Sequence, residues 1–219
     1  MTAPADSEKN AAASAAAERV ENGMAVGLGT GSTVAFFLRA LAERSLRDIR
    51  CVATSPATET AARKHGLAVE PFTELDHLDL AVDGADQVAP DGWLIKGGGG
   101  AHLREKIVAA AASKFLVICD SSKVVDELAP PIPLELRPFG LQATLKSLAR
   151  IGDVSLRDAP MSPDGGAIAD LHADAGDPAS LAARLDAEAG VSSHGLFEPA
   201  LVAEVLIARA ESVQALRPG

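Results

Sequence analysis

The stretch from residue 96 to residue 106 reads K-G-G-G-G-A-H-L-R-E-K and holds the residue types that proton transfer needs. Its four successive glycines have no Cβ to keep a ligand away from the backbone amides, and they permit positive φ. Lys96 precedes the glycines, and Glu105 falls in the first turns of the helix predicted after them. Amides, one cation and one carboxylate thus surround one small volume, which predicts half of an active site for a small phosphorylated molecule.

A second glycine loop, G-T-G-S-T at residues 29–33, stands between a predicted strand over 24–28 and a predicted helix over 34–42. Backbone N–H groups and a helix N-terminus converge in such a loop at the place where a phosphate binds. The hydroxyls of Ser32 and Thr33 would add donors there. Ordinary N-capping of the helix is the alternative explanation for both hydroxyls.

Two further polar groups follow predicted strands. D-G-A-D at residues 83–86 comes after a strand over 78–82, and D-S-S-K at 120–123 comes after a strand over 115–119. Ligands in open α/β sheets bind outside the carboxyl ends of the strands, so both groups are well placed for chemistry. A solvated turn is the alternative for the first group, since D-G is a common turn dipeptide. A tight connection is likewise the alternative for the four glycines, although so many are unfavourable in conformational entropy.

Other ligand classes fit these motifs less well. A dinucleotide fingerprint would require glycine at Val34 and an acidic residue where the second strand ends in Thr54-Ser55, and a P-loop would require a lysine after the glycines. Asp83 and Asp86 are possible metal ligands, but spacing suggests no third one. One carboxylate base beside one lysine favours proton abstraction next to a carbonyl, with the cation stabilising the enolate oxygen that forms.

Composition limits the partners and the location of the chain. The 219 residues are 47% apolar and carry a formal net charge of −10, which argues against nucleic acid and anionic membranes as partners. Cys51 and Cys119 lie in apolar runs without CxxC spacing, which is typical of reduced thiols in a cytoplasmic protein. The N-terminal residues have no apolar segment typical of a signal peptide, and no run of about 18 apolar residues predicts a membrane span.

The order of predicted elements indicates an α/β fold in two parts. Strands and helices alternate up to about residue 128, which predicts a mostly parallel sheet. After the prolines at 130–133 the order β-α-β-β-α-β is the ferredoxin-like split motif. The run over 201–208 is ambiguous between strand and helix. The remaining predicted elements are helices over residues 7–20, 56–65, 139–151 and 177–189 and strands over 49–54, 67–72, 132–137, 154–157, 167–171 and 191–197.

The combination G-L-G-T-G-S-T, D-G-A-D, K-G-G-G-G-A-x-x-R-E-K and D-S-S-K, in this order and spacing, resembles ribose-5-phosphate isomerase of the A type. The resemblance is detailed from the first helix to Lys123 and looser through P-I-P-L-E-L and G-V-S-S-H-G-L-F, which ends at residue 197. It implies a Rossmann-like catalytic domain (residues 1–129 and 198–219) and a ferredoxin-like small domain (residues 130–197) that helps to form a homodimer or homotetramer.

The resemblance also implies the reversible conversion of D-ribose 5-phosphate to D-ribulose 5-phosphate in the pentose phosphate pathway, without a metal or other cofactor. Glu105 would be the base that moves a proton between C2 and C1 through a cis-enediolate, and Asp83 would assist ring opening. Lys96 and the neighbouring glycine amides would stabilise the enediolate. The substrate, including its phosphate, would contact Thr30, Gly31, Ser32, Thr33, Asp83, Gly84, Ala85, Asp86, Lys96, Gly97, Gly98, Gly99, Lys123 and Lys9.

The second part of the chain departs from the family pattern. Residues 166–170 read G-A-I-A-D where an N-x-I-L-D-like stretch is usual, and S-S-H at 192–194 replaces an acidic or threonine pair. None of these departures touches the predicted site. Two alternatives stay open: a related sugar-phosphate isomerase or deaminase on a similar fold, and a sensing module that kept the phosphate cradle without catalysis. A base beside a cation favours an enzyme, because a sensor needs no base.

Overall fold

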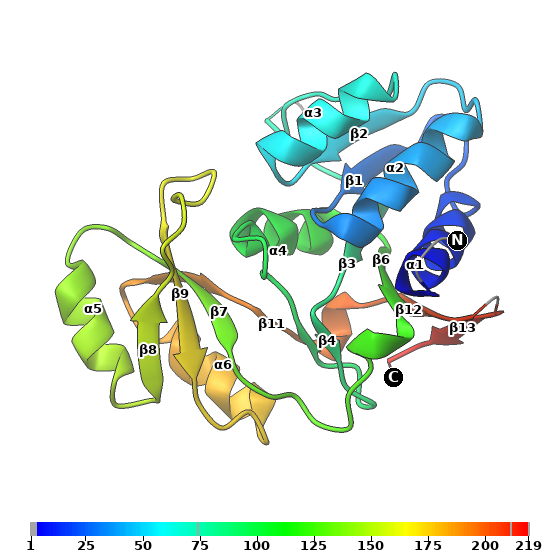
Figure 1. Cartoon of the computed structure of the whole chain (residues 1–219). Helices are drawn as coiled ribbons and strands as arrows, with labels where there is room; N and C mark the ends of the chain where they lie inside the picture. The colour runs from blue at the N-terminus through cyan, green and yellow to red at the C-terminus, as the bar shows by residue number, and fades with distance from the viewer. Residues whose placement is uncertain (1–3, 74, 211, 219) are drawn as a thin grey trace.

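A six-stranded sheet forms the larger part of the protein (Figure 1). The computed structural model describes residues 4–73, 75–210 and 212–218. The strand order is β13-β12-β6-β3-β1-β2; all neighbours are parallel except the antiparallel edge pair β12–β13. The predicted mostly parallel sheet is therefore confirmed. The strands are β1 (Ala25–Leu28), β2 (Arg50–Ala53), β3 (Leu80–Gly84), β6 (Phe115–Asp120), β12 (Glu204–Arg209) and β13 (Ser212–Leu216).

Helices cover both faces of this sheet. One face packs against α1 and α2 through small alanines of α1 and through Phe37, Leu38 and Leu41 of α2. The other face packs against α4 through Val108 and Ala109. The helix α3 begins at Pro56, and the Ser55 side chain caps it by accepting a hydrogen bond from the Thr58 N–H. The bounds are α1 (Pro4–Ala17), α2 (Ser32–Glu43), α3 (Pro56–Lys64) and α4 (His102–Ala111).

The strand order places a crevice at the ends of β1 and β3. From β1 the chain passes to β2 on one side, and β3 then pairs with β1 on its other side. This reversal is a topological switch point, where the connections leave the sheet in opposite directions and open a binding crevice. The loops that follow β1 and β3 carry residues 29–31 and 85–86. The fold thus brings two of the predicted motifs together.

The second sheet has the predicted β-α-β-β-α-β order. Its four strands are antiparallel in the order β10-β7-β9-β8, and its core includes Leu134, Leu148, Leu171 and Leu185. We call this sheet and its two helices the small unit; it lies beside the large sheet in Figure 1. The domain boundaries given above stay a prediction. The elements are β7 (Ile132–Leu136), α5 (Leu141–Leu148), β8 (Asp153–Leu156), β9 (Ala167–His172), α6 (Pro178–Asp186) and β10 (Val191–His194).

A three-stranded sheet joins the two parts, and it splits a strand predicted as continuous. The predicted strand over 191–197 breaks at Gly195 into β10 and β11 (Leu196–Phe197), and β11 pairs with β5 (Leu94–Ile95), which pairs with β4 (Gln87–Val88). A Cβ on Gly195 would lie 2.3 Å from the Lys96 carbonyl oxygen. Only glycine allows this close approach, so the chain changes sheets there.

Other predicted elements differ from the structure in their extent. Residues 67–72 form no named strand, because only Val69 makes an isolated bridge, to Cys51. The first helix spans residues 4–17 rather than 7–20. The ambiguous run over 201–208 contains the end of a short 3-10 helix, η2 (Pro199–Leu201), and most of β12. No helix among the described residues is long and apolar enough to cross a membrane.

Gly27 of β1 allows α4 to pack closely on the sheet, which gives a stability prediction. A Cβ at this position would lie 2.4 Å from Val108 Cγ1, so Gly27→Ala should lower the free energy of unfolding by about 1–3 kcal/mol through overpacking. Urea denaturation measures this change. The matched control is Gly84→Ala in β3, where the nearest atom is 3.9 Å away and a change within about 0.5 kcal/mol is expected. Equal losses in both variants would contradict the packing argument.

Candidate active site

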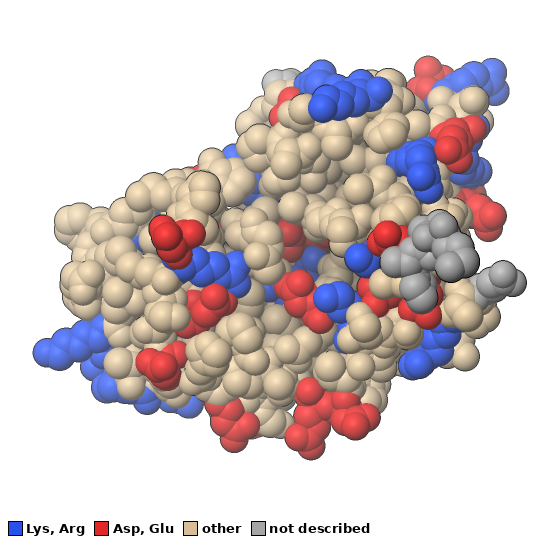
Figure 2. Space-filling model, in the orientation of Figure 1, with Lys and Arg blue, Asp and Glu red and all other residues tan. Residues whose placement is uncertain are grey.

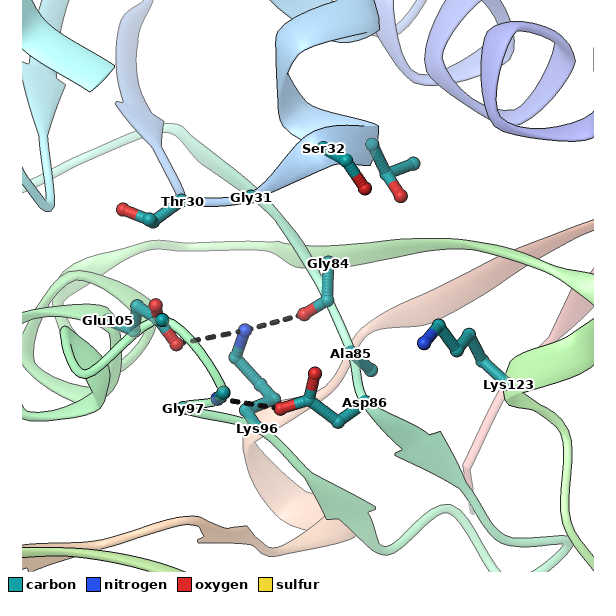
Figure 3. A pocket seen from close by; sticks show the side chains of 13 residues that line it. Thr30, Gly31, Ser32, Gly84, Ala85, Asp86, Lys96, Gly97, Glu105 and Lys123 are labelled. Carbon is teal, nitrogen blue, oxygen red and sulfur yellow. Dashed lines mark hydrogen bonds and ion pairs between the residues drawn. The ribbon is translucent and has the colours of Figure 1, made fainter. Parts of the chain in front are cut away.

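A cleft opens at the carboxyl ends of the central strands, where the predicted motifs meet (Figure 3). Its volume is about 120 Å³, which suits a small ligand better than a dinucleotide. Figure 2 shows acidic and basic side chains gathered in the hollow between the two parts of the molecule. The cleft is lined by Thr30, Gly31, Ser32, Thr33, Gly84, Ala85, Asp86, Lys96, Gly97, Gly98, Gly99, Glu105 and Lys123.

Lys96 is the centre of a buried charge cluster beside this cleft. Its Nζ lies 2.8 Å from Asp83 Oδ2 and 3.2 Å from Glu105 Oε2, and it donates a hydrogen bond to the Gly84 carbonyl at 2.5 Å. The side chains of all three charged residues are less than 5% exposed. The Phe197 ring lies below the ammonium, 5.3 Å from Nζ to the ring centroid. One buried cation therefore faces two buried carboxylates, which leaves an excess negative charge when both are ionised.

Burial and this imbalance of charge together set the protonation of the cluster. Burial raises the pKa of Glu105 to about 8; the Asp83 charge adds to the rise and Lys96 opposes it. Burial also raises the pKa of Asp83, against the effect of Lys96 and two backbone amides. Burial disfavours the Lys96 ammonium, but the two carboxylates outweigh it and raise the Lys96 pKa. Asp83 accepts hydrogen bonds from two backbone amides, which stabilise its ionised form. Glu105 is therefore the carboxyl that gains and loses a proton near neutral pH.

The two aspartates of D-G-A-D have different surroundings. Asp83 lies behind the cleft, where its Oδ1 accepts hydrogen bonds from the Thr30 and Gly84 amides at 3.0 and 2.7 Å. Asp86 lies in the cleft wall, and its Oδ2 accepts a hydrogen bond from the Gly98 amide at 2.8 Å. Asp83 thus anchors Lys96 and the end of β1, whereas Asp86 holds the glycine loop, which we define as residues 97–100.

The end of β1 and the start of α2 present free backbone donors to the cleft. Gly31 is the N-cap of α2, and no side chain caps the helix. Within the described part of the chain, the amides of Ser32 and Thr33 have no hydrogen-bond acceptor. These first amides and the helix dipole favour an anion such as a phosphate. Lys123, from the short helix η1 (Ser121–Lys123), lines the same cleft and adds a positive charge.

The structure does not bring every predicted site residue to the cleft. Lys9 is half-buried on α1 and is absent from the cleft lining, so its proposed contact with substrate stays a prediction. Its neighbour Glu8 instead accepts hydrogen bonds from the Ser121 N–H and Oγ at 2.9 and 2.7 Å. Asp83 is close to the site through Lys96 but lies outside the lining. All the other predicted site residues line the cleft.

Sequence reasoning missed the hydroxyl groups that support Thr30. Thr30 Oγ1 lies 2.8 Å from Thr54 Oγ1, 2.9 Å from Ser55 Oγ and 3.3 Å from Thr58 Oγ1. Thr58 also donates to the Gly29 carbonyl at 2.8 Å. The signal was present in the sequence, because T-S-x-x-T begins at Thr54, the last residue of the second predicted strand. These hydroxyls fix the β1–α2 loop to the start of α3.

Arg157 was also missed, and no local motif marks it. It follows β8 in the small unit, yet its guanidinium donates hydrogen bonds to the carbonyls of Gly97 and Gly98. Only the folding of the small unit onto the glycine loop brings these residues together. Within the described residues, no group of three or more His, Cys, Asp or Glu side chains could hold a metal ion.

Comparison with known proteins gives the family. Over residues 50–212 the chain matches the family described as ribose 5-phosphate isomerase A (phosphoriboisomerase A). A relative from Caulobacter vibrioides, named ribose-5-phosphate isomerase A, is 43% identical over 226 residues. The match covers 98% of this chain and 99% of the relative. The chain belongs to the ribose 5-phosphate isomerase A family. The resemblance inferred from the four motifs is therefore confirmed.

Solved structures extend the similarity to the whole fold. A ribose 5-phosphate isomerase A from Neisseria gonorrhoeae has a TM-score of 0.93 at 32% identity, covering 98% of this chain and 97% of its own. A D-ribose-5-phosphate isomerase in complex with phospho-erythronic acid has the same TM-score and identity, covering 99% of this chain and all of its own. Both cover the small unit, where the sequence departs from the family pattern.

The protonation of Glu105 gives a prediction for stability against pH. Its pKa is raised from 4.5 to about 8, so its contribution to stability is complete below pH 4.5 and is lost as pH rises through 8. Glu105→Gln removes this titration, so thermal unfolding should show the melting temperature of the variant rising relative to wild type from pH 5 to pH 9. A difference in melting temperature that stays constant over this range would mean that the pKa of Glu105 is not raised in the folded protein.

Proposed function

We propose that this protein interconverts D-ribose 5-phosphate and D-ribulose 5-phosphate, as the names of its relatives indicate for those proteins. The observation that carries the proposal is Glu105, a buried carboxylate 3.2 Å from the Lys96 ammonium at the wall of an anion-binding cleft. A base with a pKa near neutral pH removes and returns a proton efficiently, because both of its protonation states are accessible.

Binding of the sugar phosphate would begin at the β1–α2 loop. The free amides of Ser32 and Thr33 and the ammonium of Lys123 favour the phosphate dianion at one end of the cleft. The open-chain sugar would then extend toward Glu105 and Lys96 at the other end (Figure 3). The molecule has a formal net charge of −10, so this local set of donors must supply the attraction.

The proposed reaction moves one proton between two carbons. The Glu105 carboxylate takes the proton from C2, and the electron pair of that bond forms the C1–C2 double bond while O1 becomes an anion. Lys96 and the glycine-loop amides would stabilise this cis-enediolate, the oxyanion-type contribution that often dominates such steps. The O2 proton passes to O1, and Glu105 returns its proton to C1 as O2 becomes the carbonyl.

Asp83 would assist ring opening and proton transfer between the sugar oxygens, and its hold on Lys96 supports a place close to them. We propose a homodimer or homotetramer in the cytoplasm that uses no metal or other cofactor. The buried free thiols Cys51 and Cys119 support a reducing compartment.

The base is tested by Glu105→Gln. The variant keeps the shape and hydrogen bonding of the side chain but cannot accept the C2 proton, so kcat should fall by more than about a hundredfold. Binding of phospho-erythronic acid, measured by calorimetry, should persist. The matched control is Glu59→Gln, an exposed glutamate of α3, which should keep wild-type kcat. Near-wild-type turnover in Glu105→Gln would refute Glu105 as the base.

The reaction itself is tested with purified wild-type protein and ribose 5-phosphate, with and without EDTA. Formation of ribulose 5-phosphate should be the same in both samples. Activity lost with EDTA would make Asp83 and Asp86 candidate metal ligands. Binding of phospho-erythronic acid without turnover in either sample would favour a sensing module.

A further inference from the structure

The small unit reaches the active-site cleft through one side chain. Arg157 Nη1 donates hydrogen bonds to the carbonyls of Gly98 at 2.8 Å and Gly97 at 3.3 Å. Its Nε and Nη2 form a two-point ion pair with the Asp170 carboxylate of β9, at 2.7 and 2.6 Å. The pair is about one-fifth exposed, and the two points of contact fix the plane of the guanidinium. Its direction toward the glycine loop is thus set by the small unit.

These carbonyl contacts determine where the next amides point. In a trans peptide the C=O of one residue and the N–H of the next point in opposite directions. Because the Gly97 carbonyl faces Arg157, the Gly98 N–H points away and reaches Asp86 Oδ2. By the same rule, the Gly98 carbonyl on Arg157 turns the Gly99 N–H away from the small unit. Gly99 lines the cleft opposite Thr30, where a Cβ on Gly99 would lie 3.5 Å from Thr30 Cγ2.

The Gly99 amide is a free donor. Its N–H has no hydrogen-bond acceptor in the described part of the chain. A positive guanidinium on the carbonyl of the same peptide group polarises that group and strengthens its N–H as a donor. The Gly99 N–H therefore has the properties of a donor to an anionic oxygen in the cleft.

The glycine loop needs such a hold because its own backbone does not fix it. Glycine populates positive and negative φ about equally, so a peptide group between two glycines turns over at little cost. Inside the loop the Gly100 N–H bonds to the Gly97 carbonyl, and Asp86 holds the Gly98 N–H. Within the described residues, Arg157 is the only partner of the Gly98 carbonyl.

We propose that Arg157, held by Asp170, is a positioning residue that fixes the Gly98–Gly99 peptide group so that the Gly99 N–H stabilises the enediolate oxygens. This inference rests on the proposed isomerase function. The small unit then contributes to catalysis through the glycine loop, in addition to any part it has in assembly. Arg157 itself does not touch the substrate, because it lies on the far side of the peptide group.

The test is Arg157→Met in the full chain, assayed with ribose 5-phosphate. Loss of orientation should lower kcat by about 10–100-fold, somewhat less than removal of an oxyanion donor. KM should change less than about threefold, because the amides of residues 32–33 and Lys123 still bind the phosphate. Arg157→Lys keeps the charge but not the two-point geometry, so it should recover only part of kcat.

The matched control is Asp164→Asn. Asp164 lies between β8 and β9 in the chain, like Arg157, and its ion pair with Arg104 also joins the small unit to α4. It touches neither the glycine loop nor the cleft lining, so the control should keep wild-type kcat and KM. Equal losses of kcat in Asp164→Asn and Arg157→Met would overturn the proposal.

Two anions separate positioning from a merely structural role. Phospho-erythronic acid offers a carboxylate near the place of the enediolate, whereas inorganic phosphate offers only the phosphate contact. Arg157→Met should bind the sugar acid at least tenfold more weakly and inorganic phosphate equally well. Equal weakening of both would assign Arg157 to general folding and overturn the proposal. If Arg157→Met does not fold, Asp170→Asn carries the same test, because it loosens the guanidinium without removing it.

The wild-type assay separates this inference from the proposed function. Wild type that forms no ribulose 5-phosphate overturns both. If wild type is active and Arg157→Met keeps the wild-type kcat, only the proposed role of Arg157 is overturned. Active wild type with a low-kcat Arg157→Met and a normal Asp164→Asn supports both.

Discussion

The site depends on one buried positive charge shared by two buried carboxylates. Lys96 lies within 3.2 Å of both Asp83 and Glu105, and the cluster is almost completely excluded from water. Burying an unpaired charge is costly, so a single ammonium cannot stabilise both carboxylates in their ionised form. Glu105, the carboxyl with fewer hydrogen-bond donors, therefore binds and releases its proton near neutral pH. A base of intermediate strength thus follows from burial first and from this charge count second, and it needs no special property of glutamate.

The rest of the fold excludes water from this cluster and holds it beside the cleft. Phe197 and Phe115 lie against the ammonium, and β11 carries Phe197 across from the small unit to pair with β5. The Lys96 N–H donates to the Gly195 carbonyl at 2.9 Å, so even the backbone of the lysine is fixed by that crossing. Glycines at 97–100 then allow the backbone itself to form the wall of the cleft. Precision at the site therefore comes from contacts between distant segments.

The residues that sequence reasoning located are those with a local signal. Glu105, Lys96 and the glycine loop form one run, and the alternation of apolar segments predicted the parallel sheet and the order of the small unit. Reasoning from strand ends placed the D-G-A-D motif at the cleft, but it did not show that Asp83 turns back onto Lys96. Arg157 was beyond such reasoning, because its contact with Gly98 joins residues 59 positions apart. The split at Gly195 was missed since a close approach of two backbones leaves no mark on periodicity.

The chain order of the central sheet has a consequence during synthesis. β6 consists of six fully buried residues, and its neighbour β12 follows only after the entire small unit has been made. Until then β6 is an apolar strand with one unpaired edge, the kind of surface that invites pairing with other chains. β13 pairs locally with β12, but β12 itself pairs with β6, which is more than 80 residues earlier in the chain. Closure of the sheet by β12 is therefore a slow, non-local step. The nascent chain is thus most exposed to aggregation while the small unit is being added.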